Sequence, residues 1–122
     1  FGDVYGNSAG HLEFQYTARA SYALNKAFGA PIGKSFGITV GAPAAIGLVL
    51  ADTAVKAATV DAISVATPGN GGTSYSNEVN FFFSGDSGAV KQAIIAARDV
   101  GMQLLKALEP GEELKSATPY II

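Results

Sequence analysis

Apolar and polar side chains alternate along residues 12–17, and this pattern predicts the first strand of the chain. Leu12, Phe14 and Tyr16 fall on one side of such a strand, and the polar residues between them fall on the other. A period of two is typical of a strand with one buried face. Three further runs are rich in β-branched or aromatic residues and predict strands: 36–40, 60–66 and 78–84.

Apolar residues that recur every three or four positions predict three helices between and after these strands. The first covers residues 20–28 and ends at Gly29, and the second covers residues 44–59. The second is apolar nearly all round, so we expect it to be buried on more than one face. The third covers residues 88–108, and its expected buried stripe consists of Val90, Ile94, Ala97, Gly101, Leu105 and Leu108.

The predicted order of elements is β-α-β-α-β-β-α, which contains two crossover units and a hairpin. This order favours a four-stranded antiparallel sheet with helices packed on it, an α+β fold of the ferredoxin-like type. The folded domain is expected to cover residues 11–108. Residues 1–10 are rich in glycine and small polar side chains and predict a loop or linker, and residues 109–122 predict an extended C-terminal tail.

The composition adds to this fold prediction that part of the surface is apolar. The chain of 122 residues suits one domain, yet its charged residues make up only 15%, against roughly 25% in typical soluble domains. Some of its apolar surface should therefore be buried against neighbouring subunits. The net charge is −2 and no basic cluster exists, which argues against nucleic-acid binding. Asp52 and Lys56 interrupt the most apolar run, so no membrane span is expected.

Residues that carry chemistry are scarce in this chain. It has no cysteine, and His11 is its single histidine, so we expect no enzyme activity, no cofactor, no metal site and a structural role for His11. Asp86 directly precedes the third predicted helix, where it is expected to cap the helix by accepting hydrogen bonds from first-turn N–H groups. The chain begins at Phe1 without a signal-peptide pattern, and we expect a fragment or a processed product of a longer protein.

A polar, glycine-rich stretch at residues 67–77 separates the last two predicted strands. Loops of this length and composition often carry function. The glycines at 69–73 lack the spacing of a phosphate-binding loop, and they lead into a strand instead of a helix N-terminus. Phosphate binding is therefore disfavoured.

Two segments of the sequence resemble the bacterial microcompartment shell domain. Ala-Val-Lys-Ala-Ala-Thr-Val at residues 54–60 is similar to the end of that family's first helix. Gly-Asp-Ser-Gly-Ala-Val-Lys at residues 85–91 is similar to the opening of its second long helix. The strand and helix predicted within residues 11–28 come first here, whereas the standard family order places them last. The chain thus resembles a circularly permuted member of the family.

Residues 5–19 also resemble the start of the second repeat in the tandem-domain shell proteins of propanediol- and ethanol-utilisation compartments. The resemblance implies the C-terminal half of such a protein, with residues 1–10 as the linker from a preceding repeat. It implies association with the N-terminal repeat, self-association into trimers of pseudohexameric shape, and contact with other shell proteins. It further implies a non-catalytic protein located in the microcompartment shell in the bacterial cytoplasm.

The resemblance also implies roles for individual residues. The resemblance implies that each pseudohexameric trimer forms a flat disc, and Lys56 matches the family position at the edge between neighbouring discs. The pattern alone fits an ordinary solvent-facing lysine. The connection between the last two strands lines a pore in the family, and it includes here Gly71, Gly72, Thr73, Ser74, Tyr75 and Ser76. Their uncharged polar groups would exchange hydrogen bonds with diols, alcohols and aldehydes that cross the shell. A solvated loop without this role is the alternative.

The residues alone leave a second function open. A ferredoxin-like domain that uses residues 67–77 as a lid would act as a small-molecule-binding regulatory domain. Calorimetry separates the two hypotheses, because tight nucleotide binding with an ordered loop would favour the regulatory one.

Overall fold

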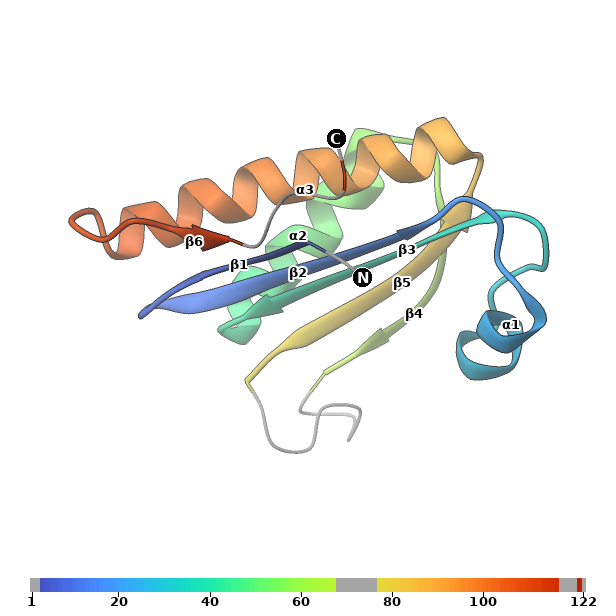
Figure 1. Ribbon diagram of the computed structural model, residues 1–122, viewed down its shortest axis with the longest axis horizontal. Helices are drawn as coiled ribbons and strands as arrows, with labels where there is room; N and C mark the ends of the chain where they lie inside the picture. Colours follow the sequence, from blue (N-terminus) through green and yellow to red (C-terminus); the bar gives the residue numbers. More distant parts are fainter. Residues whose placement is uncertain (1–2, 68–76, 117–120, 122) are drawn as a thin grey trace.

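The computed structural model describes residues 3–67, 77–116 and 121 (Figure 1). The described residues form six strands and three helices. Their bounds are β1 Asp3–Asn7, β2 Gly10–Thr17, α1 Tyr22–Phe28, β3 Ser35–Ala42, α2 Ala44–Ala57, β4 Asp61–Ala66, β5 Val79–Gly85, α3 Ser87–Leu108 and β6 Lys115–Ser116.

The strands form one sheet with the order β4-β5-β3-β2-β1-β6, in which neighbouring strands are antiparallel. Strands β2 to β5 correspond to the four predicted strands, and the three helices correspond to the predicted helices. The α+β class with an antiparallel sheet is therefore confirmed, and the sheet has two more strands than predicted.

The prediction of a loop over residues 1–10 is wrong for β1. The register pairs Asp3 with Phe14 and Asn7 with Gly10, so β1 and β2 form a hairpin. Strand β6, from the predicted tail, then pairs with the other edge of β1. Pairing along the backbone edge of β2 outweighs the low strand propensity of the small polar residues in β1.

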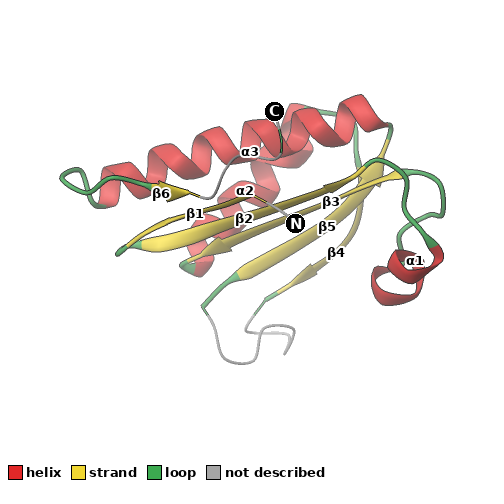
Figure 2. Ribbon diagram, viewed as in Figure 1, coloured by secondary structure: helices red, strands yellow, loops and turns green. Residues whose placement is uncertain are grey.

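Helices α2 and α3 lie on one face of the sheet, and α1 lies at one end of it (Figure 2). The main hydrophobic core fills the space between these two layers. Its largest fully buried side chains include Phe14, Phe83, Leu50 and Ile94, which come from two strands and both long helices.

The predicted stripe of α3 is confirmed from Val90 to Leu105. It is wrong for Leu108, which is 56% exposed because it lies in the last turn, beyond the last α3 residue in the core.

The buried residues of α2 are Ile46, Gly47, Leu50 and Ala54. Among the described elements the sheet and α3 cover α2, and its remaining side is exposed, so the expected burial is found only toward these two neighbours. No helix in the described ranges is long and apolar enough to cross a membrane.

Two glycines let α2 approach β3 very closely. A Cβ atom built on Gly47 would lie 2.6 Å from the carbonyl oxygen of Gly41, and one built on Gly41 would lie 2.7 Å from the Cα of Gly47. Side chains do not tolerate such distances to backbone atoms. Gly47 is therefore required near the start of α2, although glycine lowers helix propensity.

Helix α1 covers part of the opposite face of the sheet through aromatic contacts. The ring of Phe28 stacks on Phe36 of β3 and Phe82 of β5, with centroid distances of 5.5 Å and 4.9 Å. These rings and their neighbours form a second, smaller hydrophobic cluster. The two faces of the sheet therefore have separate cores.

Candidate functional site

The predicted pore residues Gly71, Gly72, Thr73, Ser74, Tyr75 and Ser76 lie outside the described residues. The strands on either side of them are described, and β4 and β5 pair as antiparallel neighbours. The segment therefore joins two adjacent strands at one end of the sheet, which is the connection expected from the sequence. Its role in permeation stays a prediction.

Lys56 lies in the last turn of α2 and is largely exposed. Its Nζ is 2.7 Å from Oδ2 of Asp52, one helical turn earlier, and the two side chains are 73% and 59% exposed. Such i, i+4 pairs stabilise a helix by about 0.3–0.5 kcal/mol. The spacing of four was visible in the sequence and would have identified Asp52 as the partner of Lys56. Nothing in this geometry requires Lys56 for the fold.

The outer side of α2 carries an exposed apolar surface next to this pair. Leu48, Val49 and Val55 are 54%, 39% and 44% exposed. Their spacing places them on the same side of the helix as Asp52 and Lys56, opposite the residues buried on the sheet. We call the surface formed by Leu48, Val49, Asp52, Val55 and Lys56 the outer face of α2. An exposed helix face of this composition is suited to contact with another protein surface.

Asp86 occupies the N-cap position of α3 with an extended backbone, as predicted, but its side chain makes no capping hydrogen bond. The predicted hydrogen bonds from first-turn N–H groups to Asp86 are therefore absent. Asp86 and the two residues after it are exposed, so water can reach these N–H groups in place of the carboxylate.

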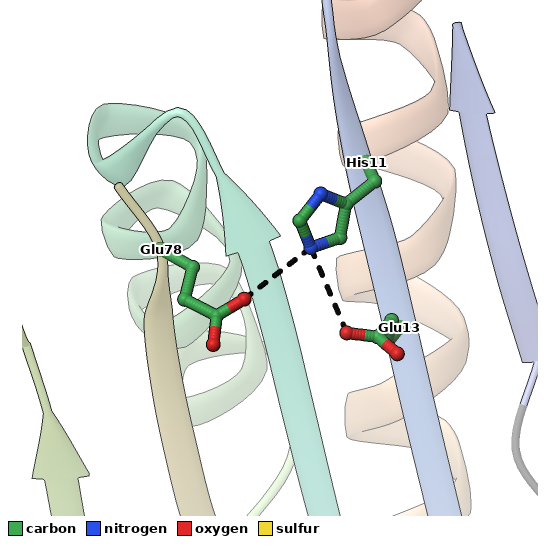
Figure 3. Close-up of side chains that lie close together, drawn as sticks. All are labelled: His11, Glu13 and Glu78. Carbon is green, nitrogen blue, oxygen red and sulfur yellow. Dashed lines mark ion pairs between the residues drawn. The ribbon is translucent and has the colours of Figure 1, made fainter. Parts of the chain in front are cut away.

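His11, Glu13 and Glu78 form a cluster that sequence reasoning missed (Figure 3). Nε2 of His11 is 3.6 Å from Oε2 of Glu13 and 3.3 Å from Oε2 of Glu78. His11 and Glu13 alternate along β2, whereas Glu78 comes from the residue just before β5. The i, i+2 spacing of the first two was visible in the sequence, but the approach of Glu78 depends on the strand order.

A second polar cluster is buried at the start of the chain. The Asp3 side chain is 1% exposed and accepts the backbone N–H of Ile121, while Arg98 Nη1 lies 3.7 Å from its carboxylate. Burial raises the pKa of the Tyr5 hydroxyl above its ordinary 10.0, and the neighbouring Asp3 carboxylate raises it further. These contacts hold the first strand against α3, and they offer no exposed reacting group.

An open groove of about 710 Å³ runs beside the β1–β2 hairpin and β6. At its rim the Ser8 amide donates a hydrogen bond of 2.9 Å to Glu112 Oε1, and the Ser8 hydroxyl donates one of 2.5 Å to Oε2. These two hydrogen bonds lower the pKa of Glu112 below its ordinary 4.5. The contact joins the hairpin to the turn after α3, so we interpret it as structural.

Comparison with known proteins identifies the family. The sequence profile described as the BMC domain matches residues 35–110. The whole chain is 57% identical to the bacterial microcompartment shell protein PduB of Salmonella typhimurium, of which it covers 44%. It is also 50% identical to the protein of the same name from Limosilactobacillus reuteri, of which it covers 50%. The chain thus spans about half the length of these curated relatives.

Solved structures agree with the sequence match. A trimeric bacterial microcompartment shell protein PduB superimposes with a TM-score of 0.88 at 47% identity, over 99% of this chain and 52% of that one. EtuB from Clostridium kluyveri superimposes with a TM-score of 0.88 at 50% identity, over 95% of this chain and 50% of that one. The profile covers more than half of the sequence, and it spans β3, α2, β4, β5 and α3. The chain therefore belongs to the BMC domain family.

Proposed function

We propose that this chain is the C-terminal half of a tandem, circularly permuted shell protein that forms trimers of pseudohexameric shape in a bacterial microcompartment shell. The relatives that it matches over its whole length are named as shell proteins, and it spans about half of each. One related crystal structure is described as trimeric. The order of elements supports permutation, because β2 and α1 precede the residues matched by the family profile.

The observation that carries this proposal is the outer face of α2. Leu48, Val49 and Val55 remain exposed although α2 is apolar on both sides, and the described part of the chain supplies no cover for them. Burying such side chains stabilises association by about 25 cal/mol per Å² of apolar surface. A neighbouring shell domain that packs on this face would bury apolar surface of the kind that the low charge content of the chain predicts. Lys56, at the end of the same face, then lies at the edge between discs.

Permeation through the shell is the second part of the proposal. The residues from Gly71 to Ser76 supply backbone and hydroxyl groups without charge, which suits diols, alcohols and aldehydes better than ions. The protein itself has a structural role and no catalytic one, in line with the relatives' names. The regulatory alternative draws no support from these relatives.

The assembly is tested with the protein in its natural length. Leu48→Lys introduces a charge into the outer face of α2. We therefore expect loss of trimers in sedimentation, or loss of the flat sheets that assembled trimers form in electron microscopy. Leu108→Lys is the matched control, because Leu108 is similarly exposed, at 56%, but lies on α3 away from this face. Unchanged assembly of folded Leu48→Lys would contradict the proposed role of this face.

A further inference from the structure

The cluster of His11, Glu13 and Glu78 is built by the register of three strands. His11 pairs with Ala42 of β3, and on the other side of β3 Gly41 pairs with Val79 of β5. Glu78, one residue before Val79, therefore approaches Ala42 from the side opposite His11. Neighbouring strands are about 4.8 Å apart, so β2 and β5 are separated by roughly twice that distance. The small side chain of Ala42 leaves space for the two longer ones to meet above β3.

The two separations from His11 are close to those between donor atoms around one metal ion. Zinc at about 2.0–2.1 Å from nitrogen and oxygen ligands in a tetrahedral site places these ligands roughly 3.4 Å apart. His11 Nε2 lies 3.6 Å and 3.3 Å from the carboxylate oxygens of Glu13 and Glu78. One ligand atom from each of the three residues lies within 4.8 Å of the others. Only small rotations of side chains are needed to place all three donors around one ion.

The donor types also select the class of metal. One imidazole nitrogen and two carboxylate oxygens are common ligands of zinc and of similar divalent transition metals. Calcium prefers six to eight oxygen ligands, and magnesium retains most of its water, so neither needs the imidazole. Two carboxylates that share one small space repel each other, and a divalent cation between them removes that repulsion.

We propose that His11, Glu13 and Glu78 bind one zinc-class divalent cation, with a fourth position open to water. The side chains are 40%, 48% and 21% exposed, so the ion enters from solvent and exchanges with it. The bound ion joins the start of β2 to the start of β5 across β3, on the face of the sheet that α2 and α3 leave uncovered. This is a binding function in addition to the proposed structural role, and it does not depend on that role.

The proposal is tested by titrating Zn²⁺ into the metal-free protein in its natural length, with calorimetry or a competing chromophoric chelator. We expect one saturable ion for each copy of this domain. His11→Ala and Glu78→Gln should each weaken the affinity at least about tenfold, because each removes a direct ligand. Glu113→Gln is the matched control: it changes the charge in the same way as Glu78→Gln, at an exposed residue outside the cluster, and it should leave the affinity unchanged.

Cobalt provides an independent readout of the coordination. Co²⁺ in the wild-type protein should give the visible absorption of a low-coordinate site with a nitrogen ligand, and His11→Ala should abolish it. Circular dichroism checks that each variant is folded. If His11→Ala does not fold, Glu78→Gln still tests the proposal. If the wild type binds no saturable Zn²⁺, or if both folded variants bind as tightly as the wild type, the cluster is only an ion pair and the proposal is wrong.

Discussion

The carboxylate of Asp3 accepts the backbone N–H of Ile121, a residue 118 positions later, at 3.2 Å from Oδ1 and 3.1 Å from Oδ2. Arg98 of α3 completes this arrangement, because its Nη1 donates a hydrogen bond of 2.6 Å to the carbonyl oxygen of Ile121. One buried carboxylate and one guanidinium thus fix both the first strand and the last described residue to the long helix.

Replacing Asp3 should destabilise the fold strongly. In Asp3→Ala, the Ile121 amide loses its acceptor and Arg98, whose side chain is 17% exposed, loses its buried counter-ion. We expect the free energy of unfolding to fall by about 3 kcal/mol, as measured by urea denaturation. Asp99→Ala is the matched control: Asp99 is also near Arg98, at 3.8 Å, but is 62% exposed, and the change should be within about 0.5 kcal/mol. Equal effects of the two substitutions would contradict this assignment.

The stability of the protein at alkaline pH should depend on Tyr5. Burial and the Asp3 carboxylate raise the pKa of Tyr5 in the folded state, so its contribution is complete below the unfolded value of 10.0 and is lost as pH rises through the folded pKa. Unfolding by urea from about pH 8 to about pH 11 should therefore show a steeper loss for the wild type than for Tyr5→Phe. Tyr22→Phe, at a side chain that is 63% exposed, should retain the wild-type slope. A wild-type slope in Tyr5→Phe would refute the prediction.

Gly47 of α2 and Gly88 of α3 should respond to alanine in opposite directions. In Gly47→Ala the new methyl group meets the Gly41 carbonyl oxygen at 2.6 Å, so α2 must move away from β3. We expect a loss of about 2–3 kcal/mol in the free energy of unfolding. Nothing lies within 4 Å of a Cβ atom on Gly88, and Gly88→Ala should stabilise the protein by up to about 1 kcal/mol. Denaturation curves of both variants decide this, and a loss of stability in Gly88→Ala would count against the reasoning.

Lys56→Ala should separate assembly from stability. Its ion pair with Asp52 is exposed, so the free energy of unfolding should change by no more than about 0.5 kcal/mol. If Lys56 lies at the edge between discs, sheets seen by electron microscopy should become smaller or disappear while the trimers remain. Lys106→Ala, an exposed lysine in the last turn of α3, is the control and should leave the sheets intact. Normal sheets of trimers in Lys56→Ala would contradict the proposed role of Lys56 at the edge between discs.

Periodicity predicted the three helices and β2, and runs of β-branched and aromatic residues predicted β3, β4 and β5. Strand β1 could not be predicted in this way, since Gly6 and Asn7 favour turns and their pairing with β2 comes from the hairpin. The outer face of α2 was predicted to be buried, because a sequence pattern does not distinguish a core from a contact with another subunit.

The candidate sites differ in the same way, because some follow from local sequence and others depend on the arrangement of the strands. The exposure of Lys56 and the position of Asp86 before α3 follow from local sequence. The meeting of His11 with Glu78 depends on which strands lie on either side of β3, and neither residue carries a local signal of it. Sequence reasoning treated His11 as a lone histidine for this reason.

The position of β6 outside β1 predicts an order of folding. Strand β6 pairs only with β1 among the described strands, and β1 in turn pairs with β2. The hairpin of β1 and β2 closes a very short loop, whereas contact between the two ends of the chain closes a loop of 118 positions at a larger entropic cost. We therefore expect the C-terminal segment to dock last, on a surface that does not exist until the N-terminal hairpin is in place.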